Sequence, residues 1–165
     1  MKAIVLIGMP GAGKSTVGVL LAKTLKRPFI DTDLVIQQRE NRFLQEIIAA
    51  EGMEAFLDIE ASAVSALALD GHVVATGGSV IYRESAMAHL RTHGITVFLS
   101  LPFAVIAHRI RNIATRGIAM RPGQTLRSLY NERQPLYERY ADITIEWTAK
   151  STLEQTVTRI TKALT

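Results

Sequence analysis

The segment Gly8-Met9-Pro10-Gly11-Ala12-Gly13-Lys14-Ser15 decides the fold of this chain, because it matches G-x4-G-K-[ST], the P-loop pattern. The apolar run Lys2–Ile7 precedes it and predicts a strand, and Thr16–Lys26 follows without a breaker and predicts a helix. Glycines in such a loop let backbone N–H groups point at phosphate oxygens, and the helix N-terminus favours the same anion. A plain glycine-rich turn between strand and helix would not account for a lysine and a serine in this register.

The same motif predicts individual roles for its residues. We expect Lys14 to reach the β- and γ-phosphates of ATP and Ser15 to ligate Mg2+. The remaining nucleotide-binding positions that we expect in this segment are Gly11, Ala12, Gly13 and Thr16.

Length and composition favour one domain, residues 1–165, with one core. The formal net charge of +4 favours anionic ligands, but no dense Lys/Arg run indicates nucleic acid. The chain has no cysteine, which is consistent with a cytoplasmic location and excludes disulfides and thiolate chemistry. No apolar run reaches the roughly 18 residues of a membrane span, and the N-terminus does not resemble a signal peptide.

Strand and helix signals alternate along the chain. Alternation of this kind predicts an α/β fold in three layers, a five-stranded parallel sheet with helices on both faces. The predicted strands are Ala3–Ile7, Pro28–Ile30, His72–Ala75, Thr96–Leu99 and Ile143–Trp147. The predicted helices after the first are Glu54–Leu69, Ala104–Ile113 and Ser151–Leu164, the last with a capping box of Ser151 and Glu154.

Ligands of a parallel sheet gather at the carboxyl ends of its strands, so the residues after each strand are candidates. Asp31-Thr32-Asp33 follows the second strand, where one carboxylate could cap a helix and the other remains for Mg2+ or a substrate hydroxyl. Thr76-Gly77-Gly78-Ser79 follows the third strand, and its glycines either permit close approach to a ligand or form a simple tight turn.

Two later segments carry arginines. Gly and Pro interrupt the helical pattern between 114 and 124, where Arg116 and Arg121 lie, and this composition predicts a mobile loop. Arg133 stands shortly before Pro135; a lone arginine is usually a solvated surface charge, so this signal is weak by itself.

Taken in order, these segments resemble the shikimate kinase family over nearly the whole chain. Asp31-Thr32-Asp33 is similar to its D-T-D motif, Glu51–Glu60 to its G-E-x-x-F-R-x-x-E stretch, Thr76-Gly77-Gly78 to its glycine turn, and Arg133–Tyr137 to its R-x-P-L-Y motif. The resemblance implies an ATP-dependent kinase for a small hydroxylated acid, shikimate first, acting in aromatic amino acid biosynthesis as a cytoplasmic monomer.

The resemblance also implies roles for single residues. Asp31 would hold Mg2+ through water, Asp33 would orient or deprotonate the acceptor hydroxyl, and Gly77, Gly78 and Arg133 would bind the acceptor. Arg121, or else Arg116, would close over the transferred phosphate as part of a lid at about 114–124. The segment around Lys150 would border the adenine.

Two departures from the family pattern fall in the acceptor pocket. Leu57 stands where the family has an arginine that grips the shikimate carboxylate, and the turn at Gly77-Gly78-Ser79 lacks a third glycine. Losing a charged bidentate contact costs on the order of 2–4 kcal/mol of binding, which predicts weak binding of shikimate. Arg83, Arg39 or Arg42 could replace the missing contact.

Three functions therefore remain open from the sequence. The first is a shikimate kinase with a modified pocket, and the second is a related kinase for another hydroxy acid or polyol, of the gluconate type. The third is a nucleotide-binding switch with little chemistry, against which Lys14, Ser15, Asp31 and Asp33 together argue.

Overall fold

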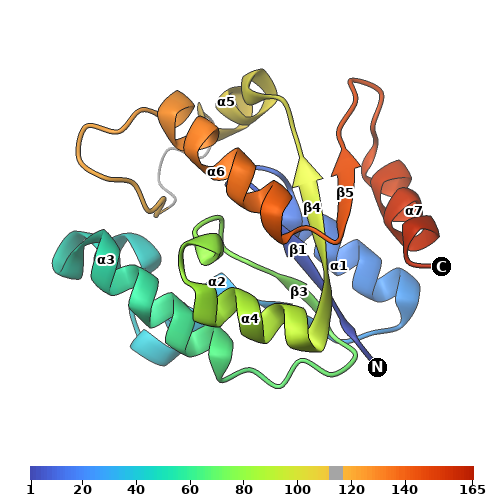
Figure 1. Ribbon diagram of the computed structural model, residues 1–165, viewed down its shortest axis with the longest axis horizontal. Coiled ribbons are helices and arrows are strands. Elements are labelled where there is room, and N and C mark those ends of the chain that lie inside the picture. The colour runs from blue at the N-terminus through green and yellow to red at the C-terminus, as the bar shows by residue number, and fades with distance from the viewer. Residues whose placement is uncertain (112–116) are drawn as a thin grey trace.

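The computed structural model describes residues 1–111 and 117–165. Within these residues the protein is built on a five-stranded sheet (Figure 1). All neighbouring strands are parallel, so their carboxyl ends meet at one edge. The order across the sheet is β2 (Phe29–Asp31), β3 (Val73–Ala75), β1 (Ala3–Ile7), β4 (Gly94–Ser100) and β5 (Ile143–Glu146).

Helices cover both faces of this sheet and complete three layers. Helices α1 and α7 pack against each other over one face, and α4 and α6 contact β4 on the other, while α3 packs on α2 and α4 (Figure 1). Their bounds are α1 Lys14–Leu25, α2 Thr32–Glu40, α3 Leu44–Ser65, α4 Glu84–His93, α5 Phe103–Arg111, α6 Leu126–Tyr140 and α7 Leu153–Ala163, with a 3-10 turn η1 at Val80–Tyr82. Within the described ranges no helix is long and apolar enough to cross a membrane.

The core explains the composition of the strands. Every residue of β1 is buried, because helices lie over both faces of the central strand, and a continuous apolar run is the result. A smaller apolar group, here called the α2–α3 cluster, lies between these helices and the segment after residue 116. Its buried members are Ile36, Leu44, Ile47, Phe56, Leu57, Ala63 and Ala119.

The predicted fold class and all five predicted strands are confirmed, with bounds that shift by one or two residues at most ends. The capping box of α7 was predicted one residue too early: Thr152 is the N-cap and pairs with Gln155. Helices α4 and α6 were not predicted, and α2 was expected only as the helix that an aspartate of Asp31–Asp33 could cap. The pattern of α4 is mostly polar, and α6 contains Pro135, which sequence reasoning treats as a helix breaker.

Candidate active site

The P-loop connects β1 to α1 at the carboxyl edge of the sheet. Gly11 and Gly13 have φ angles of 80° and 90°, a left-handed backbone that favours glycine, and Gly13 is the N-cap of α1. The amide of Ala12 donates to the Met9 carbonyl at 3.1 Å, which closes the turn. The sequence motif therefore folds as a loop wrapped around a helix N-terminus, the arrangement that binds phosphate.

Lys14 is buried at this loop. Its Nζ donates to the carbonyl oxygens of Gly8 at 2.7 Å and Met9 at 2.8 Å. The ammonium group is thus held against the loop whose glycines would face a phosphate, and Lys14 also lines the hollow beside this loop.

Ser15 and Asp31 lie together although they come from different elements. The Ser15 hydroxyl donates to Asp31 Oδ2 at 2.6 Å, and Asp31 Oδ1 accepts from the backbone N–H of Asp33 at 3.0 Å. Asp31 is therefore both the N-cap of α2 and the neighbour of the P-loop serine. A hydroxyl and a carboxylate side by side fit a hard cation such as Mg2+, which takes oxygen ligands. Among the described residues, no cluster of three or more His, Asp or Glu side chains could hold a metal ion.

A hollow on one side of the P-loop collects the predicted acceptor residues. Asp33 at the start of α2, Gly77 and Gly78 after β3, and Arg133 of α6 all line it, as do Lys14 and Ser15. Its apolar and neutral polar walls are formed by Pro10, Leu34, Gln37, Leu44, Gln45, Phe56, Ser79 and residues 117–119. The structure thus brings together all acceptor residues that the sequence indicated.

Arg133 is a buried guanidinium, not the solvated surface charge that a lone arginine usually is. Its side chain is 1% exposed, and it donates from Nη2 to the Ala119 carbonyl at 2.6 Å and from Nε to the Tyr82 hydroxyl at 3.2 Å. A Cβ at Gly78 would lie 3.0 Å from Nη1, so Nη1 lies against this glycine. Because Arg133 is locked by these bonds and lines the hollow, it can present a fixed positive charge to an anionic group.

Glu60 is a residue of this region that sequence reasoning treated only as part of a family motif. It is 1% exposed on α3, and both carboxyl oxygens accept from the Ser79 hydroxyl, at 2.9 and 3.1 Å. Burial raises the pKa of Glu60 to about 8, against the lowering effect of the Ser79 hydrogen bond and of the Arg133 and Lys14 charges. Nothing in the sequence around Glu60, four residues after Phe56, indicates that this charged residue is buried.

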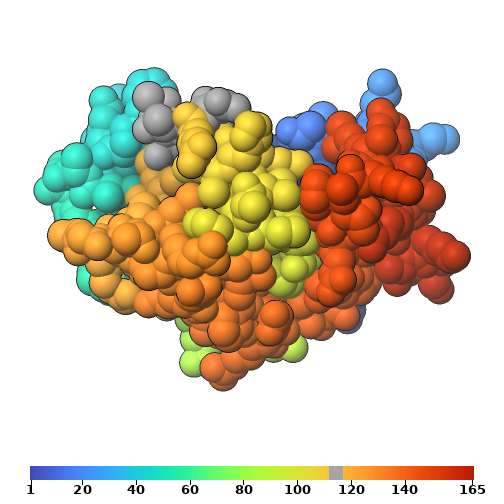
Figure 2. All heavy atoms as spheres, turned by 90° about the horizontal axis from the view of Figure 1, so that it is seen from above, coloured from blue at the N-terminus to red at the C-terminus, as the bar shows by residue number. Residues whose placement is uncertain are grey.

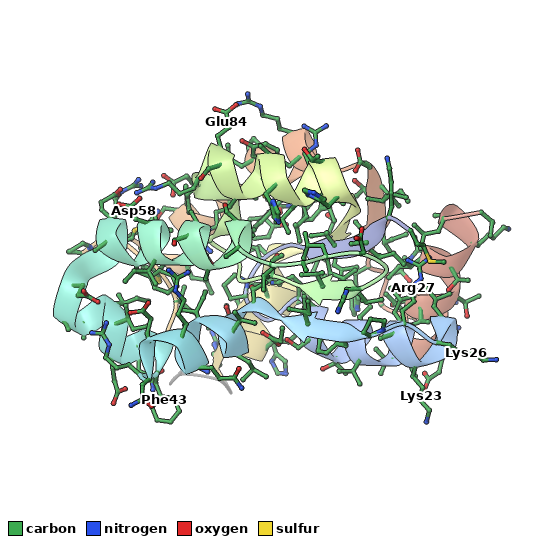
Figure 3. The ribbon with its side chains drawn as sticks, turned by 90° about the horizontal axis from the view of Figure 1, so that it is seen from below. Lys23, Lys26, Arg27, Phe43, Asp58 and Glu84 are labelled. Carbon is green, nitrogen blue, oxygen red and sulfur yellow. The ribbon has the colours of Figure 1, made fainter. Side chains whose placement is uncertain are left out.

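Leu57 lies one layer behind the acceptor hollow. It is 1% exposed within the α2–α3 cluster and does not line the hollow, whereas its neighbour Phe56 does. The three arginines that could have replaced a carboxylate contact are paired elsewhere and do not line the hollow either. Arg83 binds Glu54 and Asp58, and Figure 3 shows Asp58 on the outer side of α3. Arg42 binds Glu40 and Glu51, and Arg39 donates to Ser62.

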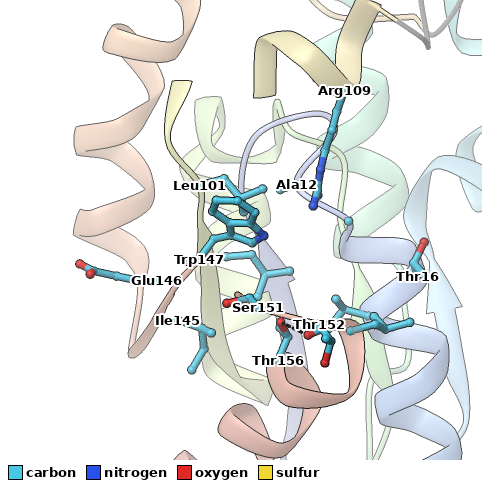
Figure 4. A pocket seen from close by; sticks show the side chains of 14 residues that line it. Ala12, Thr16, Leu101, Arg109, Ile145, Glu146, Trp147, Ser151, Thr152 and Thr156 are labelled. Atoms are coloured by element: carbon cyan, nitrogen blue, oxygen red, sulfur yellow. Dashed lines mark hydrogen bonds between the residues drawn. The ribbon is translucent and has the colours of Figure 1, made fainter. Parts of the chain in front are cut away.

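A second hollow lies on the other side of the P-loop, and Gly13 and Thr16 line both. Figure 4 shows Trp147, directly after β5, and Arg109 of α5 reaching into it beside Ala12. Arg109 Nη1 donates to the Gly11 carbonyl at 3.0 Å, so this guanidinium is tied to the P-loop. A flat indole and a planar guanidinium are suited to the faces of a purine.

Trp147 and Arg109 were not predicted from the sequence as residues of this second hollow. Trp147 could have been found, since it ends a predicted strand at the ligand-binding edge. The predicted residue, Lys150, is exposed and does not line the hollow, although its neighbours Ser151 and Thr152 do.

The predicted lid is only partly described. Arg116 lies outside the described residues, as do the first residues of the 114–124 segment. Gly117, Ile118 and Ala119 line the acceptor hollow, but Arg121 is 52% exposed and its Nη1 pairs with Glu132 Oε1 at 2.8 Å, away from the hollow. Hydrogen bonds from Tyr82, Arg121 and Gln124 lower the pKa of Glu132 to about 2. Figure 2, which views the molecule of Figure 1 from above, shows α5, α6 and the β5–α7 connection together on this upper face.

Comparison with known proteins agrees with this geometry. The family model described as shikimate kinase matches residues 10–165. The shikimate kinase of Cereibacter sphaeroides is 38% identical over 99% of this chain and 82% of its own length. That of Caldanaerobacter subterraneus is 37% identical, over 99% of this chain and 96% of its own.

Solved structures give the same relation. A shikimate kinase from Acinetobacter baumannii in complex with shikimate superposes with a TM-score of 0.88 and 30% identity, over 99% of this chain and 93% of the other. A shikimate kinase from Aquifex aeolicus superposes with a TM-score of 0.79 and 32% identity, over 98% of this chain and 95% of the other. A deoxyadenosine kinase from M. mycoides, with a TM-score of 0.62 and 15% identity over 98% and 97%, shares the fold alone.

Proposed function

The chain belongs to the shikimate kinase family, and on that premise we propose that it transfers the γ-phosphate of ATP to a hydroxyl of shikimate, giving shikimate 3-phosphate. The observation that carries this proposal is the acceptor hollow, in which a carboxylate and a buried guanidinium, Asp33 and Arg133, face the same space as Lys14. Family membership makes the protein an ATP-dependent small-molecule kinase. The acceptor is the proposed part.

On the nucleotide side, each group has a task that suits its position. The P-loop amides and Lys14 bind the phosphates and neutralise charge that grows between the β- and γ-phosphates during transfer. Trp147 and Arg109 bind the two faces of the adenine. Ser15 with Asp31 would hold Mg2+, which supplies charge neutralisation to the phosphates when it is bound.

On the acceptor side, Arg133 binds the carboxylate and fixes the orientation of the ring. Asp33 accepts a hydrogen bond from the reacting hydroxyl and receives its proton as the new P–O bond forms. Proton removal need not precede transfer, because the transition state is loose. Gly77 and Gly78 leave space beside these groups, and Arg121 and Arg116, from a lid at about 114–124, would exclude water and bind the transferred phosphate. We also propose that the enzyme acts as a monomer in the cytoplasm.

One observation favours another acceptor. Leu57 makes the region behind Phe56 apolar, and Arg133 is the one arginine among the described residues that line the hollow. An acceptor with several hydroxyls, such as a polyol or another hydroxy acid, would need fewer cations there.

An acceptor screen tests the proposal. ADP release is measured with Mg-ATP and shikimate, then with gluconate, related hydroxy acids and polyols, and the phosphorylated carbon is identified by NMR. Shikimate-dependent ADP release with phosphate on the 3-hydroxyl is the expected result. Brisk turnover of another compound without shikimate turnover would move the assignment to that acceptor, and tight ATP binding with no acceptor dependence would indicate a switch.

A further inference from the structure

The acceptor hollow is backed by a buried carboxyl group that the phosphoryl transfer itself does not use. Glu60 reaches from α3 behind the Gly77–Ser79 turn and accepts the Ser79 hydroxyl with both oxygens. A Cβ placed at Gly77 would lie 2.7 Å from Glu60 Oε2 and 2.8 Å from Asp33 Oδ1. The two carboxyl groups therefore approach the same point beside Gly77, one facing the acceptor and the other behind it.

No ion pair joins Glu60 to a lysine or arginine in the part of the chain that the structure describes. Leu57, one helical turn earlier on α3, is apolar and gives it no cation. The charged groups that face Glu60 are Asp33 on α2, Arg133 on α6 and Lys14 on α1, and both cations already donate to other oxygens. An ionised Glu60 would thus be a buried charge next to a second carboxylate, an arrangement that strongly favours the neutral acid.

We propose that Glu60 is a positioning residue that carries a proton in the working enzyme and, through its bond with Ser79 and its proximity to Asp33, holds the glycine turn and the acceptor-facing carboxylate in place. The proposal rests on the proposed function insofar as Asp33 faces the acceptor. Ionisation of Glu60 would then repel Asp33 and loosen the turn, so the acceptor side of the reaction should fail with rising pH. The raised pKa of about 8 fits this direction.

Glu60→Gln and Glu60→Ala together distinguish a requirement for a neutral side chain at position 60 from a requirement for a side chain of this size. Glutamine has the shape and neutrality of the protonated acid, so Glu60→Gln should recover most of the activity that Glu60→Ala loses. Above about pH 8 the kcat/KM of the wild type should fall by up to about tenfold per pH unit relative to Glu60→Gln. KM for the acceptor should carry this change, while KM for ATP should not. Glu138→Gln, an exposed glutamate of α6, is the matched control and should follow the wild-type profile.

Two readouts need no acceptor and so test Glu60 even if shikimate is not the substrate. The infrared spectrum of the wild type at pH 7 should contain a protonated carboxyl band that Glu60→Gln lacks and that disappears above pH 8. A group with a raised pKa in the folded state stabilises below its unfolded pKa and loses this effect as pH rises to the folded pKa. The Tm of the wild type should therefore fall relative to Glu60→Gln between pH 5 and pH 8.

The results that overturn the proposal are specific. Glu60→Gln as inactive as Glu60→Ala, or a missing carboxyl band together with equal Tm trends in wild type and Glu60→Gln, would show that Glu60 is ionised or only structural. Failure of the shikimate assay with the band and Tm trend present would instead refute the proposed acceptor and leave the protonated Glu60 standing.

Discussion

Leu57→Arg tests the acceptor pocket at the position where this chain departs from its family. Leu57 is 1% exposed in the α2–α3 cluster, directly behind Phe56. An arginine side chain is longer, and Glu60, three residues further along α3, is a buried acid that could pair with it. Through that pair the new guanidinium would be held beside the acceptor hollow and could bind the shikimate carboxylate together with Arg133.

Leu57→Arg should lower the stability of the fold, measured as Tm, but improve the binding of shikimate, measured as KM. Losing the burial of Leu57 costs about 1.5–3 kcal/mol of folding free energy, which lowers Tm by roughly 3–12 °C in a domain of this size. A new charged contact with the substrate should lower KM for shikimate at least about tenfold, a gain of roughly 1.4 kcal/mol. Pairing with a guanidinium should also lower the pKa of Glu60, and the paired cation should offset the repulsion between an ionised Glu60 and Asp33.

The assay is steady-state kinetics with shikimate at saturating Mg-ATP, beside thermal melts of each variant. Leu57→Met keeps the volume and the apolar character, so it is the matched control and should change neither KM nor Tm substantially. A wild-type protein with micromolar KM for shikimate would refute the reasoning, because the missing arginine would then not weaken binding. A folded Leu57→Arg protein with unchanged KM would refute it as well.

Three further perturbations test individual roles. Lys14→Ala should abolish turnover with an unchanged far-UV CD spectrum, and a retained rate above about a tenth of wild type, a loss of only ~1.4 kcal/mol, would contradict its role at the phosphates. Asp33→Asn should reduce kcat far more than ATP affinity; weakened Mg-ATP binding with an intact kcat would make Asp33 a metal-site residue. Arg121→Ala should lower kcat if Arg121 leaves Glu132 to bind the transferred phosphate, whereas Glu132→Gln frees this arginine and should not lower kcat as much. Equal kinetics of Arg121→Ala and wild type would show that Arg121 remains a surface ion pair.

The fold and the P-loop conformation followed from the sequence because local signals determine them. The P-loop pattern specifies glycines in a left-handed backbone and a helix N-terminus, and apolar runs such as Ala3–Ile7 report burial on both faces of a parallel sheet. Helix α6 was missed since Pro135 is a local breaker whose cost the tertiary packing of Arg133 and Tyr137 outweighs.

The acceptor side depends on contacts between residues far apart in the chain, which no local pattern specifies. Arg83 stands close in sequence to the glycine turn, yet Glu54 and Asp58 hold it on the outside of α3. Arg133 has the weaker sequence signal, yet α6 buries it in the hollow. Leu57 and Glu60 show the same dependence, because an apolar residue at 57 removes a cation from α3 and a buried acid at 60 can then remain only as a neutral group. Under the proposed function, acceptor specificity in this chain is set by which charges the fold leaves beside Asp33, and the proposed protonation of Glu60 belongs to that set as much as Arg133 does.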